Sequence, residues 1–482
     1  MRPVLDQIKY VAEHDPSREA SLSPSANCDY QSLYERIQVT AEALLQSGTT
    51  RLGLRAQNTL SWAIVDLAAS ANGITVVPIP LFFSEAQTKH LTENSQLDTV
   101  FSDSPWPLPY FEERPAGNLD GRFYSLRAPN QSAVSFSKIT YTSGSTGTPK
   151  GACLDESTMM TIVGSLSAAL ASTVSGRHLC LLPFATLLEN VAGLYLAWFM
   201  GRSVVIDDPI HLGLDSNHVF DAQRFAGAVS TYQPDSVILL PQMLKQLLES
   251  DSYQSLSPLK FIAVGGGKVA PELLERAGEV GLPVYEGYGL TECGSCVALN
   301  TPQANKTGSV GKPLPHAQIR FSPRGEILVT GAAMQGYLDD APANTEIATG
   351  DVGHIDEDGF LFVTGRIKNV IISSFGRNIS PEWVESFFLA NPFIHQIAVF
   401  GEAQPHLSAV IVPSKHAAAA RIAEAVAAIN LTLPDYARIM QWVVADDPFH
   451  VDNGLVTNNG KLRRAAIATK YDMKYQNIGD AA

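Results

Sequence analysis

Short apolar runs rich in β-branched residues alternate with helical patterns over residues 50–290. The runs occupy residues 75–79, 179–182, 203–206, 236–240 and 260–264. Continuous apolar strands of this kind are typical of parallel sheets whose two faces are covered by helices. The stretches 220–232 and 242–250 have helical spacing and complete repeated βα units. The sequence therefore predicts a doubly wound α/β fold for this part of the chain.

The pattern changes after about residue 307. Residues 318–329 and 356–363 predict hairpins, which indicates a smaller antiparallel module. Further on, strands are predicted near residues 397–400, 409–412 and 442–444, with an alanine-rich helix near 415–429. These elements indicate a small α+β domain, and residues 102–116 are predicted to form a proline-rich loop. A chain of 482 residues is long enough for two or more such cores.

The composition is typical of a soluble globular protein, with 45% apolar and 17% charged residues. A formal net charge of −14 argues against a broad nucleic-acid or anionic-membrane surface. The first residues lack a signal pattern and the five cysteines fit a reducing compartment, so we expect a cytoplasmic protein. Cys293 and Cys296 have redox or zinc spacing but stand alone in the sequence, and we expect small buried thiols there.

Residues 179–200 are long enough to cross a bilayer and carry one formal charge, Glu189. Pro183 and the adjacent Glu189 and Asn190 interrupt the apolar run. A buried strand over 179–182, a turn, and an apolar helix near 191–199 account for the segment better. We therefore expect no transmembrane segment.

The sequence YTSGSTGTPKG over residues 141–151 combines three glycines, five Ser or Thr hydroxyls and one lysine. Glycines let backbone N–H groups approach anionic oxygens, hydroxyls add donors, and Lys150 adds a compact positive charge. A flexible linker seldom follows a β-rich run and ends in Pro-Lys-Gly. The phosphate loop of mononucleotide kinases needs Ser or Thr directly after Gly-Lys, whereas Pro149 and Gly151 flank Lys150 here. The loop is therefore predicted to bind a polyphosphate in a different manner from those kinases.

Four further segments carry groups suited to a nucleotide. Residues 264–267 (VGGG) leave bare backbone for a flat base, or simply form a strand-to-helix turn. Residues 286–292 (EGYGLTE) supply an aromatic face, a hydroxyl and a carboxylate suited to Mg²⁺. Asp351 can accept both hydroxyls of a ribose, and Arg366 can reach ribose or phosphate oxygens. The run NGKLRR places Lys461 on a glycine-containing loop, although each segment alone would most often be a turn, a salt bridge or a solvated basic patch.

In this order and at these distances, the segments resemble those of the ANL superfamily of adenylate-forming enzymes, which includes acyl- and aryl-CoA synthetases, adenylation domains and firefly luciferase. The resemblance runs from about Tyr30 to Ile467. It implies an α/β protein whose large N-terminal domain, residues 1–367, contains two doubly wound α/β subdomains and a small antiparallel β module. A small mobile α+β domain, residues 368–482, would follow, with its hinge at Lys368.

The resemblance also implies a role for each matching residue. Contacts with ATP or AMP are implied for Thr142, Ser143, Gly144, Ser145, Thr146, Gly147, Thr148, Lys150, Gly266, Gly267, Glu286, Tyr288, Gly289, Thr291, Asp351 and Arg366. The residues from 142 to 150 would hold the phosphates, Gly266, Gly267 and Tyr288 would enclose adenine, and Glu286 would accept from its amine. Thr291 would contact the α-phosphate, Glu292 would bind Mg²⁺, and Asp351 with Arg366 would hold the ribose.

Lys461 would bridge the substrate carboxylate and the α-phosphate, because an ammonium relieves the repulsion that slows attack of one anion on another. The implied catalytic residues are Lys461, Thr291, Glu292 and Lys150. Rotation about Lys368 would withdraw Lys461 and bring in the loop 373–381, which contains Gly376 and Arg377, for a second half-reaction.

The run GRNISP next to the hinge is similar to the fatty acyl-CoA synthetase branch, which favours an aliphatic acid. The acid pocket is implied near residues 184–193, with Phe184, Thr186, Leu187, Leu188 and Gly193. Thr186 stands where relatives carry histidine, and Leu188 where many carry an aromatic residue. The exchange either widens the entrance or is a neutral change in the core, and an apolar lining cannot measure chain length.

The resemblance implies ATP, Mg²⁺ and CoA as the cofactors of an AMP-forming ligase. CoA is favoured as acceptor because the chain lacks room for the insertion seen in fatty acyl-AMP ligases. Positive charge for its phosphates is expected from Arg377, Arg463, Arg464, Lys470 and Lys474. These residues could equally meet an acidic acyl carrier protein, with its phosphopantetheine arm in place of CoA. A nucleotide-binding protein without catalysis is a third interpretation.

Overall fold

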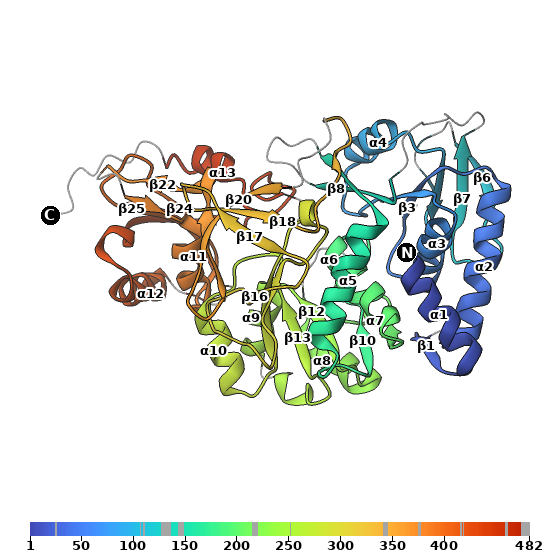
Figure 1. Cartoon of the computed structure of the whole chain (residues 1–482). Coiled ribbons are helices and arrows are strands. Elements are labelled where there is room, and N and C mark those ends of the chain that lie inside the picture. The colour runs from blue at the N-terminus through green and yellow to red at the C-terminus, as the bar shows by residue number, and fades with distance from the viewer. Residues whose placement is uncertain are drawn as a thin grey trace.

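The computed structural model describes residues 1–24, 27–106, 108, 111–126, 136–142, 149–214, 220–250, 252–340, 346–374, 377–414, 417, 419–457 and 461–473. Figure 1 shows the C-terminal elements, in orange and red, at one end of the molecule and the N-terminal helices, in blue, toward the other. Within the described residues, two large sheets, a four-stranded antiparallel sheet and a three-stranded C-terminal sheet form the framework. The predicted α/β class is confirmed.

The first large sheet has the strand order β19-β9-β8-β4-β3-β5-β7-β6. Its strands are β3 (Arg51–Arg55), β4 (Thr75–Pro78), β5 (Thr99–Ser102), β6 (Phe111–Pro115), β7 (Arg122–Leu126), β8 (Lys138–Thr142), β9 (Lys150–Leu154) and β19 (Gly336–Tyr337). β8, β4, β3 and β5 are parallel, and antiparallel strands extend both edges. The connecting helices are α2 (Tyr30–Gln46), α3 (Leu60–Ala71) and α4 (Glu85–Asn94).

The second large sheet has the strand order β16-β15-β14-β13-β12-β10-β11-β1-β2. Its strands are β1 (Glu19–Leu22), β2 (Cys28–Asp29), β10 (Arg177–Leu179), β11 (Ser203–Val205), β12 (Ser236–Leu239), β13 (Phe261–Val264), β14 (Val284–Tyr288), β15 (Ala298–Leu299) and β16 (Lys312–Pro313). The strands from β14 to β1 are parallel, and the remaining pairs are antiparallel. Every residue of β4 and β12 is buried, which explains their continuous apolar sequences.

Helices cover these sheets on both faces. One apolar cluster joins α1 (Arg2–His14), α2, α3 and α5 (Glu156–Leu170), and includes the fully buried Trp62 and Trp198. A second cluster lies between the second sheet and α8 (Ala222–Tyr232), α9 (Pro241–Glu249) and α10 (Pro271–Glu279). The doubly wound arrangement predicted from the alternation of strands and helices is therefore confirmed.

Beyond the large sheets, the chain forms antiparallel β structure and then a small α+β part. The strands β17 (Gln318–Phe321), β18 (Glu326–Thr330), β20 (Glu346–Ile355) and β21 (Leu361–Arg366) form an antiparallel sheet. The ribbon β22 (Ile371–Ile372) and β23 (Asn378–Ile379) follows. The last sheet contains β24 (Ile394–Phe400), β25 (Leu407–Pro413) and β26 (Ile439–Val444), with α11 (Pro381–Leu389), α12 (Ala419–Thr432) and α13 (Arg464–Lys470) around it.

Two local predictions were wrong in detail. Residues 102–116 were expected to be a loop, but β6 pairs with β7 over five residues because the hairpin extends the edge of the first sheet. The strand expected over 179–182 is β10, which ends at Leu179. The rest of that apolar segment is a turn, the short helix α6 (Leu187–Glu189), a π-helix (Asn190–Tyr195) and α7 (Leu196–Phe199). Among the described helices, none has the length and apolar character needed to span a membrane.

Candidate active site

Asp351 and Arg366 occupy opposite positions in the β20–β21 pair. Arg366 Nε donates to Asp351 Oδ1 at 2.7 Å, and Tyr288 Oη donates to Asp351 Oδ2 at 2.7 Å. Burial, followed by the Asp351 charge, raises the pKa of Tyr288. The antiparallel register thus brings together the three residues that were expected to hold adenosine, and each oxygen of Asp351 keeps a lone pair for a further donor.

The glycine run after β13 lies beside the apolar acid segment. Gly266 has a φ of +77°, a conformation that L-residues rarely adopt, and a Cβ there would lie 3.1 Å from Leu240 and 4.0 Å from Leu188. A Cβ on Gly267 would stay at an ordinary 3.6 Å from Pro241. Leu188 is therefore next to the backbone that was expected to face adenine.

Glu286 lies on β14 and is buried, with 4% of its surface exposed. Burial raises its pKa to about 8, although Lys268 opposes the shift. The backbone N–H of Val269 donates to Glu286 Oε1 at 3.4 Å. Gly289, on the same segment, is required by packing, since a Cβ there would lie 1.5 Å from the Ser295 carbonyl oxygen.

Thr291 and Glu292 lie on a 3-10 turn, Thr291–Cys293, that follows β14. Tyr337 Oη donates to Glu292 Oε1 at 2.6 Å. The ring of the same tyrosine lies 5.1 Å from Lys150 Nζ, which also pairs with Asp340 Oδ2 at 3.4 Å. Tyr337 is thus a candidate site residue that the sequence reasoning missed, and only the pairing of β19 with β9 places it here.

The phosphate loop itself, Ser143, Gly144, Ser145, Thr146, Gly147 and Thr148, lies outside the described residues, as does the side chain of Thr142. Its two stems are the paired strands β8 and β9, with Thr142 opposite Lys150. Helix α4 contacts both stems: His90 Nε2 lies 3.3 Å from the Pro149 carbonyl, and Tyr141 Oη donates to Asn94 Oδ1 at 2.5 Å.

Lys461 approaches this group from the C-terminal part of the chain. Burial and the Arg366 charge lower its pKa, while Glu292 and Asp351 raise it. The charges of all three residues therefore act on the Lys461 ammonium, although its side chain is still exposed to solvent. Its backbone is fixed by Thr457, whose Oγ1 accepts from the Lys461 N–H at 3.0 Å.

Arg464 does not supply free positive charge for an acceptor, and that expectation was wrong. Its guanidinium donates to Glu385 Oε2 at 2.7 Å and to Glu382 Oε1 at 3.3 Å, so two carboxylates neutralise it.

The other residues expected at the hinge or the acceptor site are placed as follows. Arg463 and Lys470 are exposed, whereas Lys474 lies outside the described residues. Arg377 is exposed and lies 4.9 Å from the Tyr436 ring. Lys368 sits in the turn Ile367–Asn369, and Gly376 lies outside the described residues.

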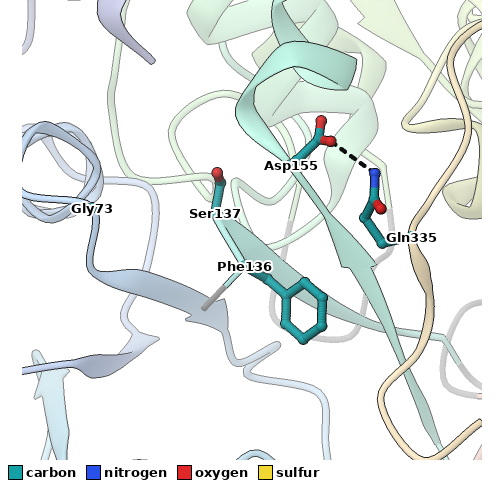
Figure 2. A pocket seen from close by; sticks show the side chains of 5 residues that line it. All are labelled: Gly73, Phe136, Ser137, Asp155 and Gln335. Atoms are coloured by element: carbon teal, nitrogen blue, oxygen red, sulfur yellow. Dashed lines mark hydrogen bonds between the residues drawn. The ribbon is translucent and has the colours of Figure 1, made fainter. Parts of the chain in front are cut away.

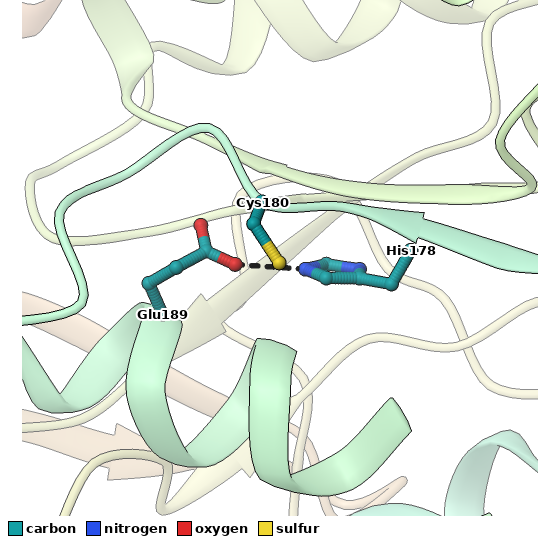
Figure 3. Close-up of side chains that lie close together, drawn as sticks. All are labelled: His178, Cys180 and Glu189. Atoms are coloured by element: carbon teal, nitrogen blue, oxygen red, sulfur yellow. Dashed lines mark hydrogen bonds and ion pairs between the residues drawn. The ribbon is translucent and has the colours of Figure 1, made fainter. Parts of the chain in front are cut away.

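The acid segment rests on a buried Glu189–His178 pair, shown in Figure 3. His178 Nε2 and Glu189 Oε1 are 2.8 Å apart, and the Leu182 N–H donates to Glu189 Oε2 at 2.9 Å. Gly193 is needed beside this pair, because a Cβ there would lie 2.2 Å from Glu189 Oε1. The one formal charge of the apolar segment is therefore satisfied inside the core.

Cys180 completes a His178, Cys180 and Glu189 group whose ligand atoms lie within 4.8 Å of one another. The direct His178–Glu189 contact already uses the nitrogen and oxygen that a metal ion would need. Burial also raises the pKa of Cys180 well above its ordinary value, which disfavours the thiolate ligand. The group is best explained as structural packing.

The other acid-segment residues differ in exposure. Phe184 is 1% exposed and its ring lies 5.3 Å from that of Trp62. Leu187 is buried, and the Thr186 hydroxyl donates to the Pro183 carbonyl at 2.7 Å. Leu188 is half-buried and contacts the second apolar cluster.

Cys293 and Cys296, the pair with redox or zinc spacing, are free buried thiols, and burial raises the pKa of both.

A separate depression is lined by Gly73, Phe136, Ser137, Asp155 and Gln335 (Figure 2). The Gln335 amide donates to Asp155 Oδ2 at 2.7 Å across its wall. None of these five residues belongs to the nucleotide or acid sets, so this depression is distinct from the candidate site.

The family model described as AMP-binding enzyme matches residues 8–338. The chain belongs to this family. A second model, described as the AMP-binding enzyme C-terminal domain, matches residues 368–478. The resemblance to adenylate-forming enzymes is thereby confirmed.

Relatives of this AMP-binding enzyme extend over nearly its whole length. It is 25% identical to a long-chain-fatty-acid–CoA ligase of Mycobacterium bovis, over 90% of this chain and 89% of that protein. It is 27% identical to a 2-succinylbenzoate–CoA ligase of Bacillus licheniformis, over 82% of this chain and 86% of that protein.

Solved structures share the fold. The o-succinylbenzoate CoA synthetase of Bacillus subtilis in complex with its acyl-adenylate intermediate superposes with a TM-score of 0.78 at 23% identity, covering 96% of this chain and 97% of that one. An anthranilate CoA ligase in complex with anthranoyl-AMP superposes with a TM-score of 0.82 at 18% identity, covering 97% and 96%.

Proposed function

We propose that the protein is an ATP-dependent acid–CoA ligase. In the first half-reaction, a carboxylate oxygen of the acid attacks the α-phosphorus of ATP, the bond to the bridging oxygen breaks, and pyrophosphate leaves. In the second, the thiol sulfur of CoA attacks the acyl carbonyl, the thiol proton passes to solvent, and AMP leaves. The grouping of Tyr288 and Arg366 around Asp351, with Glu292 held by Tyr337, carries this proposal.

Lys461 is proposed to act in the first half-reaction. An ammonium between the carboxylate and the α-phosphate reduces their mutual repulsion and stabilises the charge that develops as they bond. A protein that only bound nucleotide would not need a lysine brought from a second domain. The domains are proposed to be residues 1–367 and 368–482, with rotation about Lys368 between the half-reactions.

The adenosine moiety is proposed to lie between the glycine run and Tyr288. Asp351, held by Arg366 and Tyr288, would accept from the ribose hydroxyls, and Gly266 with Gly267 would lie along the base. Glu286 would accept from the adenine amine. The phosphate loop and Lys150 would hold the β- and γ-phosphates, and Thr291 the α-phosphate.

Glu292 fits a Mg²⁺ site. Tyr337 fixes its Oε1, and within the described part of the chain Oε2 has no hydrogen-bond partner. A carboxylate oxygen held in this way is the kind of hard ligand that Mg²⁺ prefers. When bound, the ion would neutralise phosphate charge, while Lys150 and Lys461 supply positive charge from the protein itself.

The acid is proposed to be aliphatic. Leu188 and the buried Leu187 give the segment an apolar character next to Gly266, which suits a hydrocarbon portion. The relatives include ligases named for a long-chain fatty acid and for 2-succinylbenzoate, so both acid classes belong in the test. CoA is proposed as acceptor because these relatives are named CoA ligases.

The test is pyrophosphate release by the purified protein with short, medium, long-chain and aromatic acids, each with and without CoA. Sustained release with an aliphatic acid only when CoA is present would support the proposal. Sustained release with an aromatic acid would overturn the acid class alone. Release that stops after about one turnover despite CoA would indicate a carrier protein as acceptor, and no release with any acid would indicate a protein that binds nucleotide without catalysis.

A further inference from the structure

One lysine of the large N-terminal part reaches the C-terminal part. Lys245 Nζ, on α9, donates to the carbonyl oxygens of Asn391 at 3.2 Å and Ile394 at 2.6 Å. The side chain is only 12% exposed, and Glu249 Oε1 on the same helix lies 3.9 Å away. An ammonium with so little hydration depends on these acceptors, because buried charge is costly unless it is paired or hydrogen-bonded.

The acceptors lie just beyond the C-terminal end of α11. Asn391 lies in the turn between α11 and β24, and Ile394 is the first residue of β24. The Asn391 carbonyl also accepts from the Ile394 N–H at 3.2 Å, so Lys245 uses the second lone pair of an oxygen that already closes this turn. Ala390, at the same end, packs against the apolar cluster that contains Met243 and Leu244 of α9. The contact therefore combines charge-assisted hydrogen bonds with apolar packing between the two parts of the chain.

The opposite end of α11 is tied to the hinge and to the loop of Lys461. Glu382, in its first turn, accepts from Asn369 at 2.5 Å and from Arg464 at 3.3 Å. Glu385 accepts from the same guanidinium at 2.7 Å. Arg464 is three residues from Lys461 in the sequence. Helix α11 is thus a short rigid link between the Lys245 contact and the catalytic lysine.

We propose that Lys245 is a positioning residue that holds the small domain in the orientation in which Lys461 faces Asp351 and Glu292. The contact would break when the domain rotates for thioester formation. This inference rests on the proposed two-step function, because only a reaction with two half-reactions requires the contact to form and break.

Replacing Lys245 with methionine keeps the stem of the side chain and removes both hydrogen bonds. We expect Lys245→Met to slow acyl-adenylate formation by about tenfold, the loss associated with charge-assisted hydrogen bonds. Thioester formation from a supplied acyl-adenylate should be unchanged or faster, because the rotated orientation loses no contact. Lys245→Arg, which keeps the charge and donors, should recover most of the first activity.

Lys260→Met is the matched control, since Lys260 is exposed in the same part of the chain. It should leave both half-reactions unchanged. An equal loss of both half-reactions in Lys245→Met, or no loss in either, would overturn the positioning role. Neither result would affect the proposed ligase function, which the wild-type protein tests by itself.

A distance measurement tests the contact without any catalysis. Spin labels on Ser255→Cys and Ala427→Cys, both exposed, would report the separation of the two parts by double electron–electron resonance. The native cysteines are all buried, which favours labelling of the introduced ones. Lys245→Met should broaden or shift the distance distribution of the free protein, whereas an unchanged distribution would overturn the proposal even if the protein proved inactive with every acid.

Discussion

Tyr337 donates a 2.6 Å hydrogen bond to Glu292, and its ring lies 5.1 Å from the ammonium of Lys150. One side chain therefore contacts both the proposed Mg²⁺ ligand and the lysine at the foot of the phosphate loop. It comes from β19, whose pairing with β9 places Tyr337 opposite Ala152. Tyr337 therefore links the proposed Mg²⁺ ligand Glu292 to the proposed phosphate-binding Lys150, and it can do so without contacting the substrate.

Tyr337→Phe should weaken Mg²⁺-dependent adenylate formation by about tenfold, because it removes a hydrogen bond to a charged group while keeping the ring beside Lys150. Titration of pyrophosphate release with Mg²⁺ should show that the variant needs a higher concentration of the ion. Tyr232→Phe is a matched control, since it also removes a hydrogen bond from a tyrosine to a carboxylate, that of Tyr232 to Asp207 at 2.8 Å. Tyr232 lies on α8, which carries none of the proposed site residues. An unchanged Mg²⁺ requirement in Tyr337→Phe would contradict the positioning role.

The fold was predictable where a fully buried strand requires a continuous apolar sequence. The fully buried β4 and β12 appear as continuous apolar runs, and the alternation of strands and helices led to the two parallel-based sheets. The edge strand β6 was missed because four of its five residues are exposed, three prolines precede it and Pro115 ends it. Neither apolar character nor strand propensity therefore marked it.

The site was predictable where glycine and charged residues fall in compact runs, but contacts between distant elements were not. Asp351 and Arg366 were found as separate candidates, and their pairing depends on the β20–β21 register. Tyr337 and Lys245 carry no local signal, since their partners lie 45 and about 150 residues away along the chain. Arg464 was misjudged because a sequence does not show that two carboxylates of α11 already neutralise it.

Lys138 and Asp66 form a fully buried ion pair, with Nζ to Oδ1 at 3.0 Å and neither side chain exposed. The same ammonium reaches the two ends of the π-helix through Asn190 and Tyr195. Lys138→Met should destabilise the protein by about 3–5 kcal/mol, because it leaves the carboxylate buried without its partner. Scanning calorimetry should show a Tm lower by about 4 °C.

The double variant Lys138→Met, Asp66→Leu should regain most of this loss, since removing both charges also removes the cost of burying one alone. If the double variant were as unstable as the sum of the two single variants, the ion pair would not account for the loss.

Lys368→Pro should block the rotation between half-reactions, because proline fixes φ in the turn Ile367–Asn369. Adenylate formation should persist, since the charges of Glu292 and Asp351 already act on Lys461 in this orientation, while thioester formation from a supplied acyl-adenylate should fall. Lys368→Ala removes the side chain but keeps backbone freedom, and it should leave both steps near the wild-type rate. Full thioester synthesis by the proline variant would count against domain rotation.

Lys461→Ala should suppress adenylate formation by about 100-fold or more while sparing thiol transfer from a supplied acyl-adenylate, because the ammonium is proposed to act only where two anions meet. Arg463→Ala is a suitable control for the first half-reaction, since Arg463 is exposed two residues further along and is expected to contact only CoA. Equal loss of both half-reactions in Lys461→Ala would contradict this division of roles.

The pH dependence of adenylate formation should carry the signature of Lys461. Burial and the Arg366 charge lower the pKa of Lys461, so the ammonium is lost at a lower pH than for an ordinary lysine. The protonated form is the active one in this scheme, and the rate should therefore fall as pH rises through the lowered pKa. Transfer to CoA should not fall over the same range, because rising pH ionises the attacking thiol. Lys461→Arg stays protonated throughout and should lose the alkaline decline, even if its overall rate is lower. A decline shared by both half-reactions, or one that persists in Lys461→Arg, would assign the titration to another group.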